Sequence, residues 1–188
     1  MSSICFDVLT QPSPRSTSSN SDEASDLYNR KGQLFALDLN FNTFSSNFTQ
    51  IVKSKNSTLS YSGHFILSKD QAYWSYDTPS KKEIYINKNQ VTIVEHDLEQ
   101  VIFSHLDNIP NLNEIFKKAS LIDKDKLVAK YDNINYTIKL NQEQIQSISY
   151  KDEFENDVII NLNNQIKNPK INSDIFKAKI PQNYDIVR

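Results

Sequence analysis

The sequence predicts a mainly β fold in which one strongly curved antiparallel sheet forms an incomplete, unclosed β-barrel covered by a lid of short helices. Short apolar runs with a period of two recur along most of the chain, and counting them indicates about ten strands. No helical pattern alternates with these runs, so a parallel βαβ sheet is not indicated. Residues 111–119 switch to a helical period, which predicts a helix that covers the concave side of the sheet. A closed barrel would not need such a cover, so the helix indicates an unclosed one.

The composition is that of an ordinary globular domain. With 188 residues, 38% of them hydrophobic, the chain can bury one real core. Its net charge of −2 leaves no basic excess to bind nucleic acid, and no apolar run is long enough to cross a membrane. A single cysteine excludes an intramolecular disulfide, so packing alone must stabilise the fold.

Residues 1–32 differ in composition from the rest of the chain. The segment TQPSPRSTSSNSDEASD is rich in serine and has no apolar period, so it cannot bury enough surface to offset its ordering entropy. We interpret residues 1–32 as a flexible or cloning-derived tail and residues 33–188 as a single domain. The start of the chain lacks a charged segment followed by a long apolar run, so no intact secretion signal is expected.

The first elements expected in the domain are a short helix and two long strands. Residues 33–41 form an apolar patch with helical spacing, and residues 44–52 and 58–67 alternate as strands do. Because the chain has only two glycines, asparagine is expected to make many of its turns. One face of the first strand carries Phe44, Ser46, Phe48, Gln50 and Val52.

The stretch GHFILSKDQAYWSYDTPSKKEIYINKNQVTIVEHDLEQ, residues 63–100, predicts a meander of antiparallel strands. An aromatic-Trp pair repeats the strand period before a Thr-Pro turn. Residues 83–87 and 90–95 are joined by two residues, too short a link for anything but a hairpin. Residues 101–104 continue the meander.

Residues 111–119 form the clearest helix in the chain. Leu112, Ile115, Phe116 and Ala119 lie at i, i+3, i+4 and i+7, and so share one face. Asn108 or Asn111 can cap the start, and the apolar stripe must cover something. Further strands are expected at residues 126–131, 134–140, 144–151 and 158–162, before a less regular segment at 174–180.

Three segments of the chain resemble the LolA family, the periplasmic carriers of outer-membrane lipoproteins. The first is FSSNFTQ, residues 44–50, which is similar to the family's F-x-x-x-F-x-Q strand. The second is the meander at residues 63–100, and the third is the closing segment at residues 172–187 with its F-x-x-x-x-P spacing. Together they extend the resemblance over roughly residues 34–188, in order and at compatible spacing.

The resemblance implies a chaperone that binds lipoprotein acyl chains in a hydrophobic cavity and carries them from the inner to the outer membrane. Its partners would be acylated lipoproteins, an inner-membrane ABC-type release complex and an outer-membrane acceptor, and a single copy would suffice. No enzymatic activity, cofactor or metal is implied. Leu112, Ile115, Phe116 and Ala119 would form the lid. The cavity would be lined by Phe48, Phe65, Leu67, Trp74, Tyr76, Ile93 and Phe103.

One position departs from the family pattern. LolA-type carriers place an arginine at the end of the strand that begins here at Gly63, where its hydrogen bonds help to hold the lid closed. The matching residue is Lys69, which keeps the charge but lacks the planar guanidinium with its many donors. Lid closure through Lys69 would therefore be weaker or differently bonded, unless Lys69 is simply a solvated strand end.

Two other functions remain open, beside the possibility that the aromatic face is an ordinary core. A periplasmic binder of other lipids or hydrophobic ligands could share the fold, because fold alone does not fix the cargo. A hydrolase or metal site could use His96 with Glu95, Asp97 and Glu99. A charged turn between two strands is the simpler interpretation of these residues. The shortage of glycine argues against a phosphate-binding loop.

Overall fold

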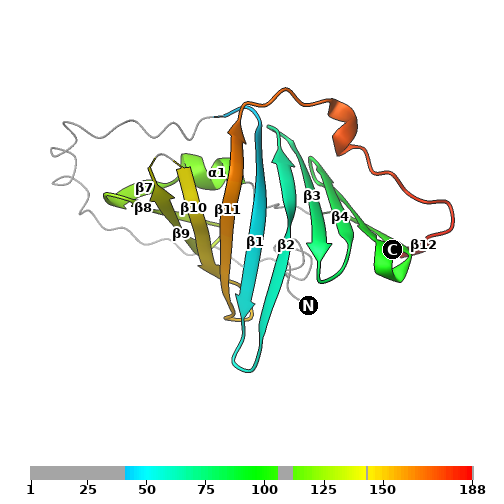
Figure 1. Cartoon of the computed structure of the whole chain (residues 1–188), viewed down its shortest axis with the longest axis horizontal. Helices are drawn as coiled ribbons and strands as arrows, with labels where there is room; N and C mark the ends of the chain where they lie inside the picture. The colour runs from blue at the N-terminus through cyan, green and yellow to red at the C-terminus, as the bar shows by residue number, and fades with distance from the viewer. Residues whose placement is uncertain (1–40, 106–111, 143, 188) are drawn as a thin grey trace.

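A computed structural model describes residues 41–105, 112–142 and 144–187 of the chain. These residues form one twelve-stranded sheet, which bends strongly without closing (Figure 1). The prediction of a mainly β fold with one curved, unclosed sheet is therefore confirmed. The expected helix at residues 33–41 and the tail at residues 1–32 fall outside the described residues, apart from Phe41.

The first half of the chain builds one wing of the sheet as a meander. The hairpin expected between residues 83 and 95 is present, and the short 3-10 helix η2 (His96–Leu98) precedes the last strand of this wing. The strands are β1 (Phe44–Lys53), β2 (Thr58–Leu67), β3 (Gln71–Thr78), β4 (Lys82–Asn87), β5 (Gln90–Glu95) and β6 (Gln100–His105).

The second half builds the other wing, again as a meander. It opens with the helix α1 (Leu112–Lys117) and comprises β7 (Ser120–Asp123), β8 (Lys126–Tyr131), β9 (Ile134–Asn141), β10 (Gln144–Lys151) and β11 (Asp157–Lys167). Antiparallel pairing of β11 with β1 joins the two wings at the centre of the sheet. The chain ends with the 3-10 helix η3 (Ser173–Phe176) and β12 (Asp185–Val187), which pairs in parallel with β6.

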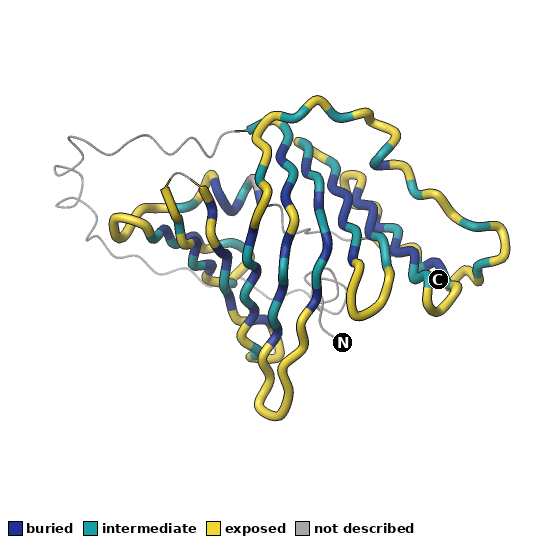
Figure 2. The backbone as a smooth tube through the Cα atoms, in the orientation of Figure 1, coloured by how far each residue is buried: buried dark blue, intermediate teal, exposed yellow. Residues whose placement is uncertain are grey.

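The main core lies inside the curve of the sheet. A single cluster of buried side chains joins β1–β5 of one wing with β8–β11 of the other and includes residues of α1. Strands so far apart in the order of the sheet can share a cluster only where the sheet curves around it. Figure 2 shows the resulting alternation of buried and less buried positions along the central strands.

Several aromatic rings pack against one another in this core. Phe65 and Trp74 stack with centroids 4.4 Å apart and an interplanar angle of 22°. Phe48 meets Trp74 edge-on at 5.3 Å and Tyr76 edge-on at 5.0 Å. Stacked and edge-to-face pairs of this kind add about 0.5–1.5 kcal/mol each beyond the area they bury.

Gly63 permits a close approach between the backbones of β2 and β3. A Cβ atom at position 63 would lie 1.9 Å from the carbonyl oxygen of Ser75 on β3 and 3.0 Å from the ring of Phe48. The register between β2 and β3 is irregular at this point, between Ser62 and Gly63. Glycine is therefore required here for space.

The convex face of β3–β6 is covered by the segment that follows β11. This C-terminal strap, residues 168–187, runs past the outside of the sheet and returns to its edge as β12 (Figure 1). Phe176 and the strap residues that flank it pack in a second cluster with Tyr73, Tyr85, Val94 and Val101. The residues expected as an irregular segment at 174–180 thus form the end of η3 and an extended stretch.

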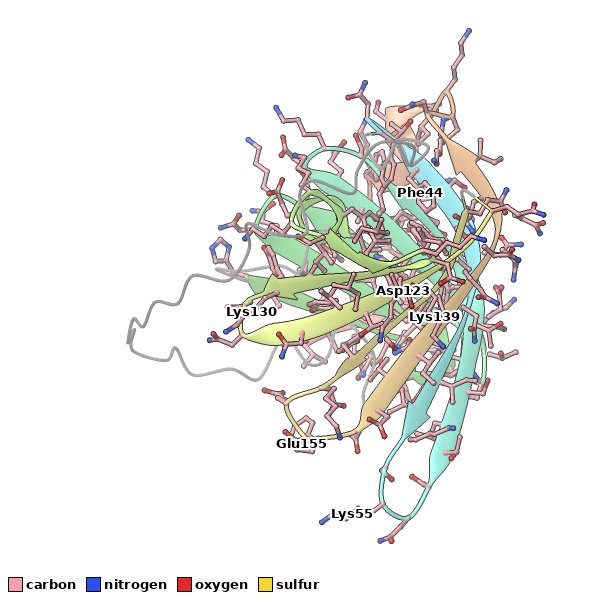
Figure 3. The ribbon with its side chains drawn as sticks, turned by 90° about the vertical axis from the view of Figure 1, so that its left-hand side faces the viewer. Phe44, Lys55, Asp123, Lys130, Lys139 and Glu155 are labelled. Atoms are coloured by element: carbon pink, nitrogen blue, oxygen red, sulfur yellow. The ribbon has the colours of Figure 1, made fainter. Side chains whose placement is uncertain are left out.

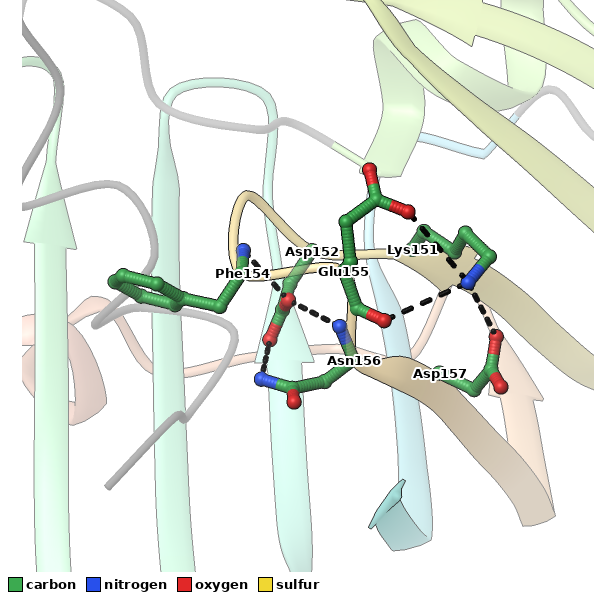
Figure 4. Close-up of polar contacts among 6 residues, drawn as sticks. All are labelled: Lys151, Asp152, Phe154, Glu155, Asn156 and Asp157. Atoms are coloured by element: carbon green, nitrogen blue, oxygen red, sulfur yellow. Dashed lines mark hydrogen bonds and ion pairs between the residues drawn. The ribbon is translucent and has the colours of Figure 1, made fainter. Parts of the chain in front are cut away.

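The turns rely on asparagine less than the sequence predicts. Asn133, Asn164 and Asn168 have positive φ, but so do Lys88, Glu99, Asp132, Gln142 and Glu155. The turn between β10 and β11 shows how a non-Asn residue is held in this conformation (Figure 4). The buried carboxylate of Asp152 accepts hydrogen bonds from the backbone N–H of Phe154 and of Asn156 and from Nδ2 of Asn156, at 2.8–2.9 Å.

Candidate functional site

The concave face gathers most of the side chains that the sequence assigned to a cavity. Phe48, Phe65, Leu67, Trp74, Tyr76 and Ile93 are all buried in the main core. They come from β1, β2, β3 and β5, and alternate residues of each strand place them on the inner face. The face is thus apolar, continuous and rich in aromatic rings.

Phe103 is the exception, and its predicted position is wrong. Val101 belongs to the second cluster on the convex face, and Ile102 packs against the main core. Alternation along β6 therefore places Phe103 on the convex face with Val101. Phe103 is 40% exposed. The inward position on this strand is taken by Ile102, which packs against the main core.

Helix α1 packs on the inner face with the side predicted for the lid. Leu112, Ile115 and Phe116 are buried in the main core. Ala119 also packs against it, although the helix ends at Lys117 and is shorter than expected. The expected cap residues Asn108 and Asn111 lie outside the described residues. Among the residues that the structure describes, one short α-helix lies where a lid of several helices was expected.

Two aromatic contacts tie α1 to the start of β1. The ring of Phe116 meets that of Phe41 edge-on at 5.8 Å, and Phe41 in turn stacks on Phe44 at 4.7 Å. In Figure 3, Phe44 and Lys55 mark opposite ends of the hairpin that β1 and β2 form. The helix therefore covers the end of the inner face that is distant from the β1–β2 turn.

Polar groups are concentrated toward the other end of the inner face. Gln50 is fully buried, and its Oε1 accepts a long hydrogen bond of 3.4 Å from the Tyr76 hydroxyl. The Tyr76 ring meets Tyr61 edge-on at 6.2 Å, and Lys82 Nζ lies 4.6 Å from the Tyr76 centroid. Alternation alone predicts that Gln50 lies on this face, but no local pattern predicts that Tyr61 and Lys82 lie beside it.

Lys69 lies beyond the end of β2, in the exposed turn before β3. β2 has the bounds expected for this strand, residues 58–67, so Lys69 follows the strand, and the Ser68 N–H donates a 2.8 Å hydrogen bond to the carbonyl of Gln71 in the turn. Lys69 is exposed in this turn, and its predicted role in lid closure stays a hypothesis.

His96 joins the C-terminal strap to the convex face of the sheet. Its Nε2 lies 3.3 Å from the Glu83 carboxylate, and its Nδ1 lies 2.9 Å from the Tyr184 hydroxyl. Glu83 also accepts hydrogen bonds from the hydroxyls of Tyr73 and Tyr85, at 2.7 and 3.0 Å. The carboxylate beside His96 is therefore Glu83, which the sequence did not single out, and the arrangement favours a structural role.

The carboxylates considered with His96 have other partners. Glu95 accepts a hydrogen bond from the side-chain amide of Gln100, and Asp97 accepts one of 3.2 Å from the N–H of Lys81. Glu99 ends η2 in a left-handed conformation, its N–H bonded to the His96 carbonyl. Within the described ranges, no three His, Cys, Asp or Glu side chains come together as metal ligands would.

Burial changes the pKa values of several side chains on the outer face of the sheet. Desolvation, with contributions from Glu83, raises the pKa of Tyr73 to about 12 and raises that of Tyr85 well above its usual value. Both hydroxyls therefore stay protonated and keep donating to Glu83. Desolvation also lowers the pKa of His64, partly opposed by the charge of Asp77.

Across the described part of the chain, no helix is long and apolar enough to span a bilayer.

Comparison with known proteins identifies the family. The family described as "Outer membrane lipoprotein carrier protein LolA" matches residues 39–127. An outer-membrane lipoprotein carrier protein of Campylobacter jejuni is 99% identical over 157 residues, which cover 84% of this chain and 93% of that protein. The chain belongs to the LolA family.

More distant LolA relatives agree with this assignment. The outer-membrane lipoprotein carrier protein of Helicobacter pylori strain HPAG1 is 31% identical over 147 residues, covering 78% of this chain and 80% of that protein. The protein of the same name from Helicobacter hepaticus is also 31% identical, over 160 residues that cover 82% of this chain and 88% of the relative.

Solved structures share the fold of this LolA-family chain at low sequence identity. A LolA superfamily protein from Nitrosomonas europaea superposes with a TM-score of 0.50 at 10% identity, covering 76% of this chain and 94% of its own. An uncharacterized conserved protein from Thermus thermophilus superposes with a TM-score of 0.51 at 10% identity, covering 80% of this chain and 92% of its own. These two likenesses show that the fold is shared.

Proposed function

We propose that this protein is a periplasmic chaperone that carries lipoproteins from the inner to the outer membrane, with their acyl chains held against the concave face of the sheet. The observation that carries the proposal is the 99% identity to a protein named outer-membrane lipoprotein carrier. The continuous apolar inner face supports it, since acyl chains need such a surface.

The proposed site is the inner face beneath α1. Phe48, Phe65, Leu67, Trp74, Tyr76 and Ile93 would contact the acyl chains, and Ile102 would extend the surface to β6. Leu112, Ile115, Phe116 and Ala119 pack on the same core, so movement of α1 would open space for cargo.

The energies of opening and loading are similar, which suits a carrier that must also release. Exposing Leu112, Ile115 and Phe116 costs about 1.5–3 kcal/mol for each side chain. Each methylene that leaves water contributes about 0.8 kcal/mol, so roughly six to eleven methylenes offset the opening of the lid. Net affinity then stays modest, and cargo can be passed on.

Partners and organisation follow from this function. The cargo would be acylated lipoproteins, received from an inner-membrane ABC-type release complex and delivered to an outer-membrane acceptor. Residues 33–188 would act as one carrier domain and as a single copy, with residues 1–32 as a tail. The role needs no cofactor and no covalent step, and Lys69 would help to hold the lid closed.

Mass spectrometry of bound cargo tests the proposal. The purified protein is incubated with detergent-solubilised triacylated lipoprotein, re-purified and extracted with organic solvent, beside a Trp74→Ala/Phe65→Ala variant. We expect co-purified lipoprotein with the wild type and loss of it with the variant. An exposed pair on the outer side, Phe103→Ala/Leu98→Ala, is the matched control and should retain cargo.

Two results would contradict the proposal. Retention of phospholipid alone would favour a general lipid binder that shares the fold. A protein that binds no lipid and resists α1 opening, measured as slow amide exchange at Leu112–Lys117, would mean that the aromatic face is only a core.

A further inference from the structure

Gln50 places an amide donor without a partner in the apolar interior. Its side chain is 0% exposed, and among the residues that the structure describes, Nε2 has no hydrogen-bond partner. A buried donor without an acceptor is destabilising, and native structures contain few of them. Such a group calls for an explanation, and a ligand that brings an acceptor supplies one.

The geometry directs this donor toward the proposed cargo site. Gln50 lies on β1 between Phe48 and Val52, two residues from each, and both of these side chains face inward. Because side chains alternate along a strand, Gln50 faces inward with them. In the sheet it stands opposite Tyr61 of β2 and Ile160 of β11, both buried. The amide therefore lies on the same face that would contact acyl chains.

The chemistry of the surroundings selects the acceptor. The amide N–H groups can only donate, so the ligand must offer an oxygen with a lone pair. Among the buried residues that the structure describes, Asp152 is the single charged one, and it lies in the β10–β11 turn. Lys82, whose Nζ lies 4.6 Å from the Tyr76 centroid, is only half-buried, so the described inner face offers no fully buried cation to accompany an anionic ligand group, which favours a neutral carbonyl oxygen.

We propose that Gln50 donates a hydrogen bond through Nε2 to the ester carbonyl oxygen of a bound acyl chain, and so fixes how deeply the chain enters. The inference rests on the proposed function, because it assumes that acyl chains occupy the inner face. Tyr76 is a positioning residue in this arrangement, since its hydroxyl holds Oε1 of Gln50 and turns Nε2 to the ligand.

The position of Gln50 also sets the direction of the chain. Gln50 lies three residues before the end of β1, beside Tyr61 and Tyr76, whereas Phe44 at the start of β1 leads through Phe41 to the helix α1. Six residues of strand separate Phe44 from Gln50, a distance of about 20 Å, comparable to a long extended acyl chain. The ester group would sit at the tyrosine end and the chain terminus beneath α1.

A matched pair of lipids tests the proposal. Dioctanoylglycerol carries ester carbonyls, and its ether analogue dioctylglycerol replaces each carbonyl with a methylene while keeping the size of the molecule. Binding is followed by fluorescence of Trp74, the single tryptophan of the chain. We expect the wild type to prefer the ester by about tenfold, and Gln50→Met to lose this preference by weakening the ester alone, a change of about 1.4 kcal/mol.

Ser46→Ala is the control for the same strand face. Ser46 is buried four residues away, but its hydroxyl is satisfied by the carbonyl oxygens of Asn47 and Asn163, at 2.8 and 2.9 Å. The control should therefore keep the preference for the ester. Isotope-labelled ester carbonyl provides an independent signal, because its infrared band should lie at lower wavenumber in the wild-type complex than in Gln50→Met.

Each outcome decides between the two proposals. Equal affinity of the wild type for ester and ether, or a preference that survives in Gln50→Met, would overturn the role of Gln50 and leave acyl binding intact. Failure of the wild type to bind either lipid would overturn the proposed function itself. If Gln50→Met does not fold, an unshifted carbonyl band in the wild-type complex still overturns the hydrogen bond.

Discussion

The hydroxyl oxygen of Tyr184 lies 2.9 Å from Nδ1 of His96, and this hydrogen bond fastens the C-terminal strap to the convex face of the sheet. The imidazole is in turn held by Glu83 through Nε2, so one partly buried network connects β4, η2 and the strap. The strap is therefore held by polar groups as well as by its apolar contacts.

Tyr184→Phe should loosen the strap. Losing a partly buried hydrogen bond lowers the free energy of unfolding by about 1 kcal/mol, measured by urea denaturation. Hydrogen exchange should become faster across residues 171–187 and stay unchanged in β1. Lys177→Gln is the control, because its ion pair with Asp174 lies in the same strap but is exposed and worth little. Equal losses in both variants would count against the network.

Gly63→Ala should destabilise the centre of the sheet. The new methyl group would lie 1.9 Å from the Ser75 carbonyl oxygen, so β2 and β3 must separate. We expect a loss of about 3 kcal/mol in the free energy of unfolding, read from denaturant curves. Ser60→Ala on the same strand is exposed and should change stability little. A variant as stable as the wild type would show that the sheet can adjust here.

Alternation predicted the bounds of several strands. β5, β8 and β10 begin and end where the alternation predicts, and the apolar stripe of α1 packs as expected. Strand β6 is apolar at three successive positions, so alternation could not decide whether Ile102 or Phe103 points inward. Pairing with β5 places Ile102 opposite Ile93, which is buried in the main core.

Other features depend on contacts between distant parts of the chain. β7 is exposed at every residue, so it has no amphipathic pattern and is a strand only because it pairs with β8. The three residues of β12 are likewise exposed and are ordered by pairing with β6. The network of Glu83, His96 and Tyr184 joins residues up to 88 positions apart, which no local pattern reveals.

His64 should make the folded state sensitive to acid. Burial lowers the pKa of His64 in the folded protein, so at mildly acidic pH the unfolded chain binds the proton more readily. Stability is therefore lost as pH falls below about 6.5, the pKa of an exposed histidine, and is unaffected above it. His64→Gln should flatten the decrease in unfolding free energy at acid pH, and Asp77→Asn should steepen it. Parallel pH curves for all three proteins would exclude this effect.

Lys69→Leu should affect cargo release more than folding. Lys69 is exposed in the β2–β3 turn, so loss of its charge should change the unfolding free energy by less than about 0.5 kcal/mol. If Lys69 helps to close the lid, the rate of lipid transfer to acceptor vesicles should change in the variant. Lys55→Leu, at the β1–β2 turn, is the exposed control and should transfer at the wild-type rate. Thermal stability and release that fall together in Lys69→Leu would contradict the role.

Phe116→Ala tests whether α1 is a lid. Phe116 is buried against the inner face, so truncation should lower the free energy of unfolding by about 3–5 kcal/mol. Loss of the Phe116 packing also destabilises the closed position of α1. A ligand that binds only the open state should then bind more tightly, at most by the factor by which the equilibrium shifts toward the open state. Unfolding by urea and titration with dioctanoylglycerol measure the two effects. Leu121→Ala, exposed on β7, should change neither. Lower stability together with lower affinity would mean that Phe116 contacts the bound chain and that α1 does not close over it.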